Sequence, residues 1–252
     1  MSFKDHFSSQ AADYVKFRPR YPGELYEFIF SHVKNKHIAW DAATGNGQVA
    51  IALAEVFDKV IATDASVNQI NHAKPHPKVI YKVSTVENSG IPDGVADLIT
   101  VGQALQWFNY EKFFSEVNRV AKRGCFFAAW GYTLHHINTQ VDAVIHHYYK
   151  NIVGPYWTPE RKEVDNRYQT IPFPFPLIDT PAFTMRTKLN MDELLGYLNT
   201  WSSTQLYIKD KGHNPLELIE TDLLKAWGHP HEEKEAVWPL FMKAGYVHNA
   251  GK

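Results

Sequence analysis

Several features that mark common protein classes are scarce in this sequence. The chain of 252 residues has one cysteine, Cys125, which leaves no partner for an internal disulfide and favours a cytoplasmic location. No apolar run approaches the roughly 20 residues that cross a bilayer, so we expect no membrane partner. The opening residues, Met1 to Phe7, lack the apolar core of a secretory signal peptide.

An excess of either charge is also missing. Lys and Arg together number 26 and Asp and Glu 27, for a formal net charge of −1. Without a basic field there is little long-range attraction to a phosphate backbone, and we expect no nucleic-acid partner. The thirteen histidines lack metal-site spacing, since His72 and His76 are interrupted by Pro75 and His135 directly precedes His136. We therefore predict no metal site.

What the sequence does have is a glycine turn between two regular elements. Residues 37–48 read H-I-A-W-D-A-A-T-G-N-G-Q, where Ile38 to Trp40 form a short apolar run and Asp41 ends it. Gly45-Asn46-Gly47 then leads into the apolar-periodic run that starts at Val49. This order predicts a strand, a turn and a helix, the first half of a β-α-β unit. Glycines there accept positive φ and let a ligand approach the backbone.

A second carboxylate belongs to the same unit. The next predicted strand, Lys59 to Thr63, ends in Asp64. Neighbouring parallel strands end at one edge of a sheet, so Asp41 and Asp64 should flank the glycine loop. The helix after the loop presents free N–H groups and a partial positive charge. This arrangement indicates a nucleoside-binding site.

The glycine pattern leaves the nucleoside open. Gly45-x-Gly47-x-x-Ala50 satisfies the dinucleotide fingerprint, and Asp64 follows at about the expected ~20 residues, so a nicotinamide-dependent oxidoreductase is one interpretation. Asp41 argues against it, because a carboxylate there would repel a pyrophosphate. It would suit a ligand with a cationic amino group, such as S-adenosylmethionine.

Four stretches carry a family resemblance. D-A-A-T-G-N-G (41–47) resembles the first motif of the Rossmann-like, class I S-adenosylmethionine-dependent methyltransferases of type 11. The strand D-L-I-T-V (97–101) running into Q-A-L-Q-W-F (103–108) is similar to the trans-aconitate methyltransferase-like subgroup, as are R-P-R-Y-P (18–22) and T-W-S-S (200–203). The similarity extends from Tyr14 to about Trp238.

This resemblance implies a fold and a role for each segment of the chain. The fold would be α/β: a doubly wound, seven-stranded, mainly parallel sheet with an antiparallel last strand and a C-terminal lid of helices and loops. Residues 1–252 would form a single domain, with an N-terminal arm and helix (1–35), a core that binds the cofactor S-adenosyl-L-methionine (36–132), and a substrate lid with the final strands (133–252). The partner would be a small-molecule substrate.

The resemblance also implies site residues. Asp41 would face the methionine amino group, Asp64 the ribose hydroxyls, and Val86 and Glu87 the adenine. The full set expected to bind cofactor is Asp41, Ala43, Gly45, Asn46, Gly47, Gln48, Asp64, Ala65, Val86, Glu87 and Gln103. Residues expected at the substrate are Arg18, Tyr21, Trp107 and Trp130. The alternatives without a role in binding are that Arg18 and Tyr21 are solvated or packed and that Glu87 is a solvated loop acid.

Gln106 departs from the family, whose members usually carry His there. A neutral amide cannot take a proton near pH 7, so we expect Gln106 to orient an acceptor that is already anionic, such as a small carboxylate. A hydroxyl or amine acceptor would need a base, for which His135, His136 or Tyr21 are candidates. A third interpretation is a non-catalytic relative that kept the nucleoside pocket and lost the chemistry.

Outside these motifs the pattern predicts helices over 110–122, 139–152 and 215–227 and strands over 124–130, 183–189 and 236–242. Asn190 and Glu193 match a capping box. Pro239 predicts that the last strand is an edge strand or bulged, because proline has no N–H to donate. Cys125, inside an apolar run, is expected to be a core residue.

Overall fold

The sheet follows the predicted α/β plan. The computed structural model describes residues 19–247 and contains one seven-stranded sheet, in the order β3-β2-β1-β4-β5-β7-β6. Its strands are β1 (Ile38–Ala42), β2 (Lys59–Asp64), β3 (Val79–Val83), β4 (Ala96–Gly102), β5 (Ala121–Tyr132), β6 (Phe183–Leu189) and β7 (Lys234–Tyr246). The first five pair in parallel, and β7 is antiparallel to both β5 and β6. The doubly wound fold with a reversed last strand is confirmed.

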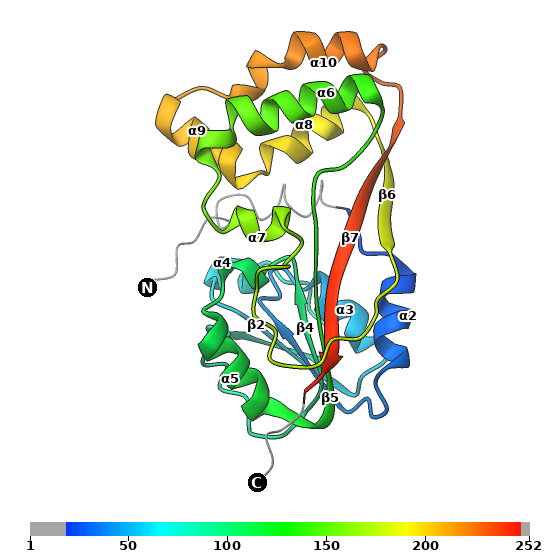
Figure 1. Cartoon of the computed structure of the whole chain (residues 1–252), viewed down its shortest axis with the longest axis vertical. Helices are drawn as coiled ribbons and strands as arrows, with labels where there is room; N and C mark the ends of the chain where they lie inside the picture. The colour runs from blue at the N-terminus through cyan, green and yellow to red at the C-terminus, as the bar shows by residue number, and fades with distance from the viewer. Residues whose placement is uncertain (1–18, 248–252) are drawn as a thin grey trace.

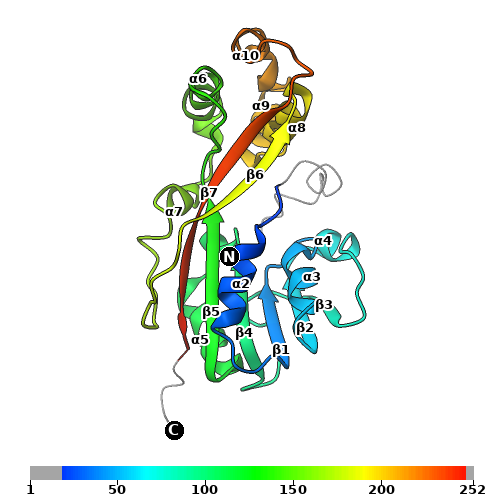
Figure 2. The ribbon, with the colours of Figure 1, turned by 90° about the vertical axis from the view of Figure 1, so that its right-hand side faces the viewer.

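Alternation along each strand builds two hydrophobic cores, one on each face of the sheet. On β1, Ala39 belongs to the core beneath α2 (Gly23–Ser31) and α3 (Gln48–Ala54). Its neighbour Trp40 points to the opposite core, with Phe113 of α5 (Tyr110–Val120). Successive side chains of a strand face opposite sides, so a sheet covered on both faces needs apolar residues throughout. Figure 2 shows α2 and α3 on one side of the strands and α5 on the other.

Helices from the second half of the chain gather beyond the carboxyl ends of the parallel strands (Figure 1). They are α6 (Thr139–His147), α8 (Met191–Asn199), α9 (Ser202–Lys211) and α10 (Glu220–Trp227), which we call the helical cap. Between this cap and the sheet lies the short helix α7 (Arg161–Asp165), and α4 (Val67–Asn71) follows β2. The cap is built over buried aromatic and aliphatic side chains: Tyr148, Leu194, Leu198, Trp201, Leu223 and Trp227.

Most helices and strands lie close to where the local sequence pattern predicts them. The strand Phe183–Leu189 has the predicted bounds, and Asn190 and Glu193 form the capping box of α8. The predicted helix over 139–152 continues past α6 as a π-helical turn, Tyr148–Ile152, and that over 215–227 is divided into a 3₁₀ turn, Pro215–Leu218, and α10. Helix α5 ends at Val120, two residues early, because Ala121 already has extended backbone and opens β5.

The prediction that Pro239 marks an edge strand is wrong. Strand β7 lies between β5 and β6, and Pro239 pairs with Thr184 of β6. The N–H of Val237 faces His136, on the β5 side, and backbone direction alternates along a strand, so Pro239 faces that side too. Strand β5 pairs only as far as Tyr132 with Leu240, so no β5 partner stands opposite Pro239. The missing N–H therefore costs no ladder bond.

Two further features of the described residues bear on the sequence analysis. Cys125 is a core residue, 1% exposed, and burial raises the pKa of its thiol. Within residues 19–247, none of the helices has the length and apolarity needed to cross a membrane.

Candidate active site

The glycine turn has a backbone that other residues adopt with difficulty. Gly45 has φ 58° and Gly47 has φ 89°, both in the left-handed region. A Cβ on Gly47 would lie 2.2 Å from the hydroxyl oxygen of Tyr81, so a side chain would also collide with β3. Gly47 is the N-cap of α3, and the turn therefore brings bare backbone and a helix N-terminus to the carboxyl edge of the sheet.

Asp41, near the end of β1, is a buried carboxylate with no counterion among residues 19–247. Its side chain is 1% exposed, and it accepts hydrogen bonds from Thr44 Oγ1 at 2.5 Å and Thr100 Oγ1 at 2.9 Å. Within residues 19–247 no cationic side chain pairs with it. Burial raises the pKa of Asp41 to about 7, the hydroxyl bonds oppose this, and the nearby charge of Asp64 adds to it. A cation delivered by a ligand would favour the charged form.

Asp64 ends β2 next to it and is tied to the same turn. One carboxylate oxygen accepts from the N–H of Gly45 and the other from the N–H of Ser66, each at 2.8 Å. These two bonds fix the orientation of the Asp64 carboxylate. The two acids flank the glycine turn, as the sequence predicted.

The loop after β3 carries Val86 and Glu87. Val86 is 6% exposed, and Glu87 Oε1 accepts from the N–H of Asn109 at 3.1 Å. Glu87 is therefore bonded to the loop that precedes α5, although it remains at the cavity wall.

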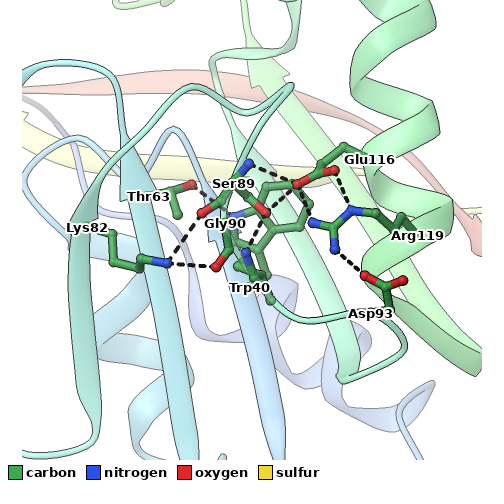
Figure 3. Close-up of polar contacts among 9 residues, drawn as sticks. Trp40, Thr63, Lys82, Ser89, Gly90, Asp93, Glu116 and Arg119 are labelled. Atoms are coloured by element: carbon green, nitrogen blue, oxygen red, sulfur yellow. Dashed lines mark hydrogen bonds and ion pairs between the residues drawn. The ribbon is translucent and has the colours of Figure 1, made fainter.

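A network of hydrogen bonds and ion pairs fixes the later part of this loop, at Ser89, Gly90 and Asp93 (Figure 3). Ser89 donates to Glu116 Oε1 through its backbone N–H at 2.8 Å and its hydroxyl at 2.5 Å. Arg119 binds the same carboxylate through Nε and a terminal nitrogen and also reaches Asp93. From the other side, Lys82 Nζ donates to the carbonyl of Gly90 at 2.9 Å. Burial alone would raise the pKa of Glu116, but the bonds from Arg119 and Ser89 lower it overall.

One large cavity, which we call the main cavity, opens over these elements. All of the residues that the sequence predicted to bind cofactor line it: Asp41, Ala43, Gly45, Asn46, Gly47, Gln48, Asp64, Ala65, Val86, Glu87 and Gln103. The cavity wall combines two carboxylates, exposed backbone and a helix N-terminus, and these groups suit a nucleoside with a cationic amino group.

A second, smaller cavity adjoins it beneath the helical cap. Its walls are Gln103, Gln106, Trp107, Tyr132, Thr133, Leu134, Trp157, Thr158, Arg161, Val164, Tyr197, Trp201 and Ser202. We call it the aromatic chamber. Five residues line both cavities and form a shared wall: Gln103, Gln106, Trp107, Tyr132 and Thr158. Two ligands, one in each cavity, would meet at this wall.

The two glutamines of the shared wall are already bonded within the protein. Gln103 has φ 56°. Its side-chain amide accepts from the N–H of Tyr132 at 2.7 Å and donates to the carbonyl of Tyr132 at 3.2 Å, and so pairs with the end of β5 as a neighbouring strand would. Gln106 is 7% exposed, accepts from the hydroxyl of Tyr168 at 2.6 Å and donates to the carbonyl of Gln103 at 3.1 Å. Both shape the wall more than they offer free polar groups.

The residues predicted to contact substrate fall into three groups. Tyr21 and Trp107 line the main cavity, while Arg18 lies outside the described residues. Trp130 has no exposed surface and lines neither cavity. It alternates toward the core beneath α2, where the ring of Tyr21 packs edge-on against it at 5.4 Å. Its position makes Trp130 a packing residue and argues against its predicted contact with substrate.

Of the predicted base candidates, only Tyr21 lines a cavity. His135 is 2% exposed, and neither of its ring nitrogens has a hydrogen-bond partner. It packs between Tyr197 and Trp238, and burial lowers its pKa to about 4. His136 lies at the surface near Asp142. No cluster of three or more metal-ligating side chains occurs in the described part of the chain.

Sequence reasoning missed the far wall of the chamber. Trp157 and Arg161 lie outside every helix and strand that the sequence predicted, and Trp201 entered only as part of the T-W-S-S motif. The one available signal was the density of tryptophan and tyrosine around a single arginine between 149 and 161.

Comparison with known proteins agrees with this geometry. Residues 40–129 match the family model described as a methyltransferase domain. A candidate methyltransferase of Dictyostelium discoideum is 37% identical over 247 residues, which cover 95% of this chain and 94% of that protein. The methyltransferase cfoB of Aspergillus candidus is 31% identical over 145 residues, 51% of this chain and 45% of that one.

A solved structure extends the likeness to the whole fold. A candidate type II methyltransferase from Anaeromyxobacter dehalogenans shares 37% identity and superposes with a TM-score of 0.85. The match covers 92% of this chain and 98% of that chain, so it includes the helical cap as well as the sheet.

Proposed function

This chain belongs to the S-adenosylmethionine-dependent methyltransferases, and from that premise we propose that it methylates a small carboxylic acid held in the aromatic chamber. S-adenosylmethionine supplies a methyl group activated by the positive charge of its sulfonium. In this proposal Asp41 faces its amino group, Asp64 its ribose hydroxyls, and Val86 and Glu87 its adenine. The nicotinamide interpretation is set aside, because the relatives are methyltransferases.

One observation supports the choice of acceptor. The shared wall consists of Gln103, Gln106, Trp107, Tyr132 and Thr158, so among its described residues there is no His, Asp, Glu or Lys. A carboxylate carries its nucleophilic charge near pH 7 and needs no base, whereas an ammonium or alcohol must lose a proton. The protein then has to align donor and acceptor and exclude water, which the chamber and the helical cap would do. The trans-aconitate-like resemblance of 103–108 favours the same substrate class.

A product assay tests the proposal. The enzyme is incubated with S-adenosylmethionine and one of three matched acceptors, namely phenylacetate, a phenol or a benzylamine, and S-adenosylhomocysteine is measured by mass spectrometry. We expect its formation with the acid. Turnover confined to the phenol or the amine would contradict the proposal. Tight cofactor binding with no turnover of any small acceptor would support the non-catalytic interpretation.

A further inference from the structure

The aromatic chamber has one charged residue among its described lining residues, Arg161. It opens α7, and its side chain is 18% exposed. The guanidinium carbon lies 4.6 Å from the centre of the Trp157 ring and 5.2 Å from that of Tyr149. Stacking on two rings fixes the plane of the guanidinium while leaving its edges available for hydrogen bonds.

Among residues 19–247, only one edge of that guanidinium has hydrogen-bond partners. Arg161 Nε donates to the hydroxyl of Tyr149 at 2.9 Å and to Asp165 Oδ1 at 3.0 Å. Both of its terminal nitrogens lack a hydrogen-bond partner within residues 19–247. Four of the five N–H donors of an arginine belong to those nitrogens, and they form the fork that matches a carboxylate. Asp165, itself 44% exposed, offsets part of the charge from the Nε side alone.

A second unpartnered donor lies beside the first. The indole Nε1 of Trp157 is shielded from solvent and has no hydrogen-bond partner among the described residues, 19–247. A buried N–H without an acceptor is costly, and native proteins leave few of them. Trp157 lines the chamber and carries the Arg161 guanidinium over its ring. The same region therefore holds an arginine fork and an indole N–H, both donors, that have no acceptor among residues 19–247.

We propose that Arg161 and Trp157 form an anion subsite that binds a carboxylate of the acceptor, an inference that rests on the proposed function. Arg161 lines the chamber and is not among the residues that line the main cavity, so the subsite lies inside the chamber, where a bound carboxylate keeps one lone-pair site for the methyl group. The carboxylate accepts two N–H bonds from the fork, and the indole N–H supplies a third. Aromatic walls around the pair exclude water and strengthen each bond.

Binding of a defined probe tests the subsite apart from turnover. The full-length protein, saturated with S-adenosylhomocysteine, is titrated by calorimetry with phenylacetate and with its neutral isostere phenylacetamide. We expect the wild type to bind the acid at least tenfold more tightly than the amide. Arg161→Gln should abolish this preference, and Arg161→Lys should restore part of it because the charge returns without the fork. Trp157→Phe, which keeps the ring and removes the N–H, should reduce it several-fold.

Arg186→Gln is the matched control. Arg186 is 58% exposed on β6 and pairs with Glu235 at the surface, so its loss should leave the preference unchanged. If Arg161→Gln fails to fold, Arg161→Lys and Trp157→Phe still decide the matter. A wild type that prefers the acid, with a preference that survives all three chamber variants, overturns the subsite alone. A wild type that binds acid and amide equally overturns both the subsite and the acid acceptor.

Discussion

The hydroxyl of Tyr168 donates a 2.6 Å hydrogen bond to the amide oxygen of Gln106, and both side chains are buried. Gln106 thus has its oxygen occupied by the protein and one N–H on the carbonyl of Gln103. The residue that was expected to orient the acceptor is itself held by two neighbours. We therefore propose that Gln106 contributes to methyl transfer by fixing the position of the shared wall, with at most one N–H left to donate.

We predict that Tyr168→Phe lowers the free energy of unfolding by about 1–3 kcal/mol, because it leaves the buried Gln106 oxygen without a donor. Urea denaturation measures this directly. Tyr156→Phe is the control, since the hydroxyl of Tyr156 bonds to Asp210 at the surface and its loss should cost much less. Equal effects of the two substitutions would mean that the Tyr168–Gln106 bond contributes nothing specific.

Cofactor binding should depend on the charge of Asp41. The pKa of this carboxyl is raised to about 7 in the free protein, mainly by burial, so it is largely protonated below pH 7 and charged above it. A cationic amino group binds the charged form, which predicts weaker binding of S-adenosylmethionine as pH falls from 8 to 6. Binding near pH 7 should also release protons, because the ligand lowers the pKa.

Calorimetry in buffers of different ionisation enthalpy detects that proton release. Asp41→Asn should abolish both the release and the pH dependence, since an amide does not ionise. A Kd for the wild type that is the same at pH 6 and pH 8 would place the amino group away from Asp41.

Asp64→Ala should weaken S-adenosylmethionine binding by about 1.5–3 kcal/mol, roughly ten- to a hundredfold in Kd, through the loss of a charged hydrogen-bond acceptor. Asp64 also accepts the N–H groups of Gly45 and Ser66, so part of the effect will come from a looser turn. Asp93→Ala removes a surface carboxylate instead and should leave Kd unchanged. Affinity retained in Asp64→Ala would remove this residue from the ribose site.

His135 should make the fold sensitive to acid. Burial lowers its pKa from 6.5 to about 4, so the unfolded chain takes up a proton more readily than the folded one. The neutral form contributes its full stability above pH 6.5, and this is lost as pH falls toward 4, up to about 3 kcal/mol. His135→Phe should flatten the unfolding free energy over that window. The surface control His136→Gln should keep the wild-type slope, and a wild-type slope in His135→Phe would contradict the assignment.

The elements that sequence reasoning located well are those with local causes. Gly45 and Gly47 stand where the backbone is left-handed, and Asn190 and Glu193 cap α8 across three residues. Asp41 and Asp64 could be paired because adjacent parallel strands end at one edge of the sheet. Each of these signals is carried by a few neighbouring residues, so it survives without knowledge of the tertiary structure.

What escaped prediction depends on contacts between distant segments. Pro239 suggested an edge strand, yet β7 lies inside the sheet. The proline is tolerated there because the pairing with β5 ends at Leu240, so no hydrogen bond from residue 239 is needed. The hydrogen bond to the Gln106 oxygen could not be predicted, since its donor Tyr168 lies 62 residues further along the chain. Trp130 read equally well as a substrate contact or as core, and only the face of β5 on which it falls decides between them.

The most direct test of the central claim, methyl transfer to a carboxylate, is the chemistry of the product. The enzyme is given S-adenosylmethionine labelled in the methyl group together with 4-hydroxyphenylacetate, which offers both a carboxylate and a phenol, and the product is treated with mild alkali. A methyl ester is hydrolysed and releases its label as volatile methanol, whereas a methyl ether or methylamine keeps it. We predict that the transferred label becomes volatile after alkali, and transferred label that remains non-volatile would contradict the account.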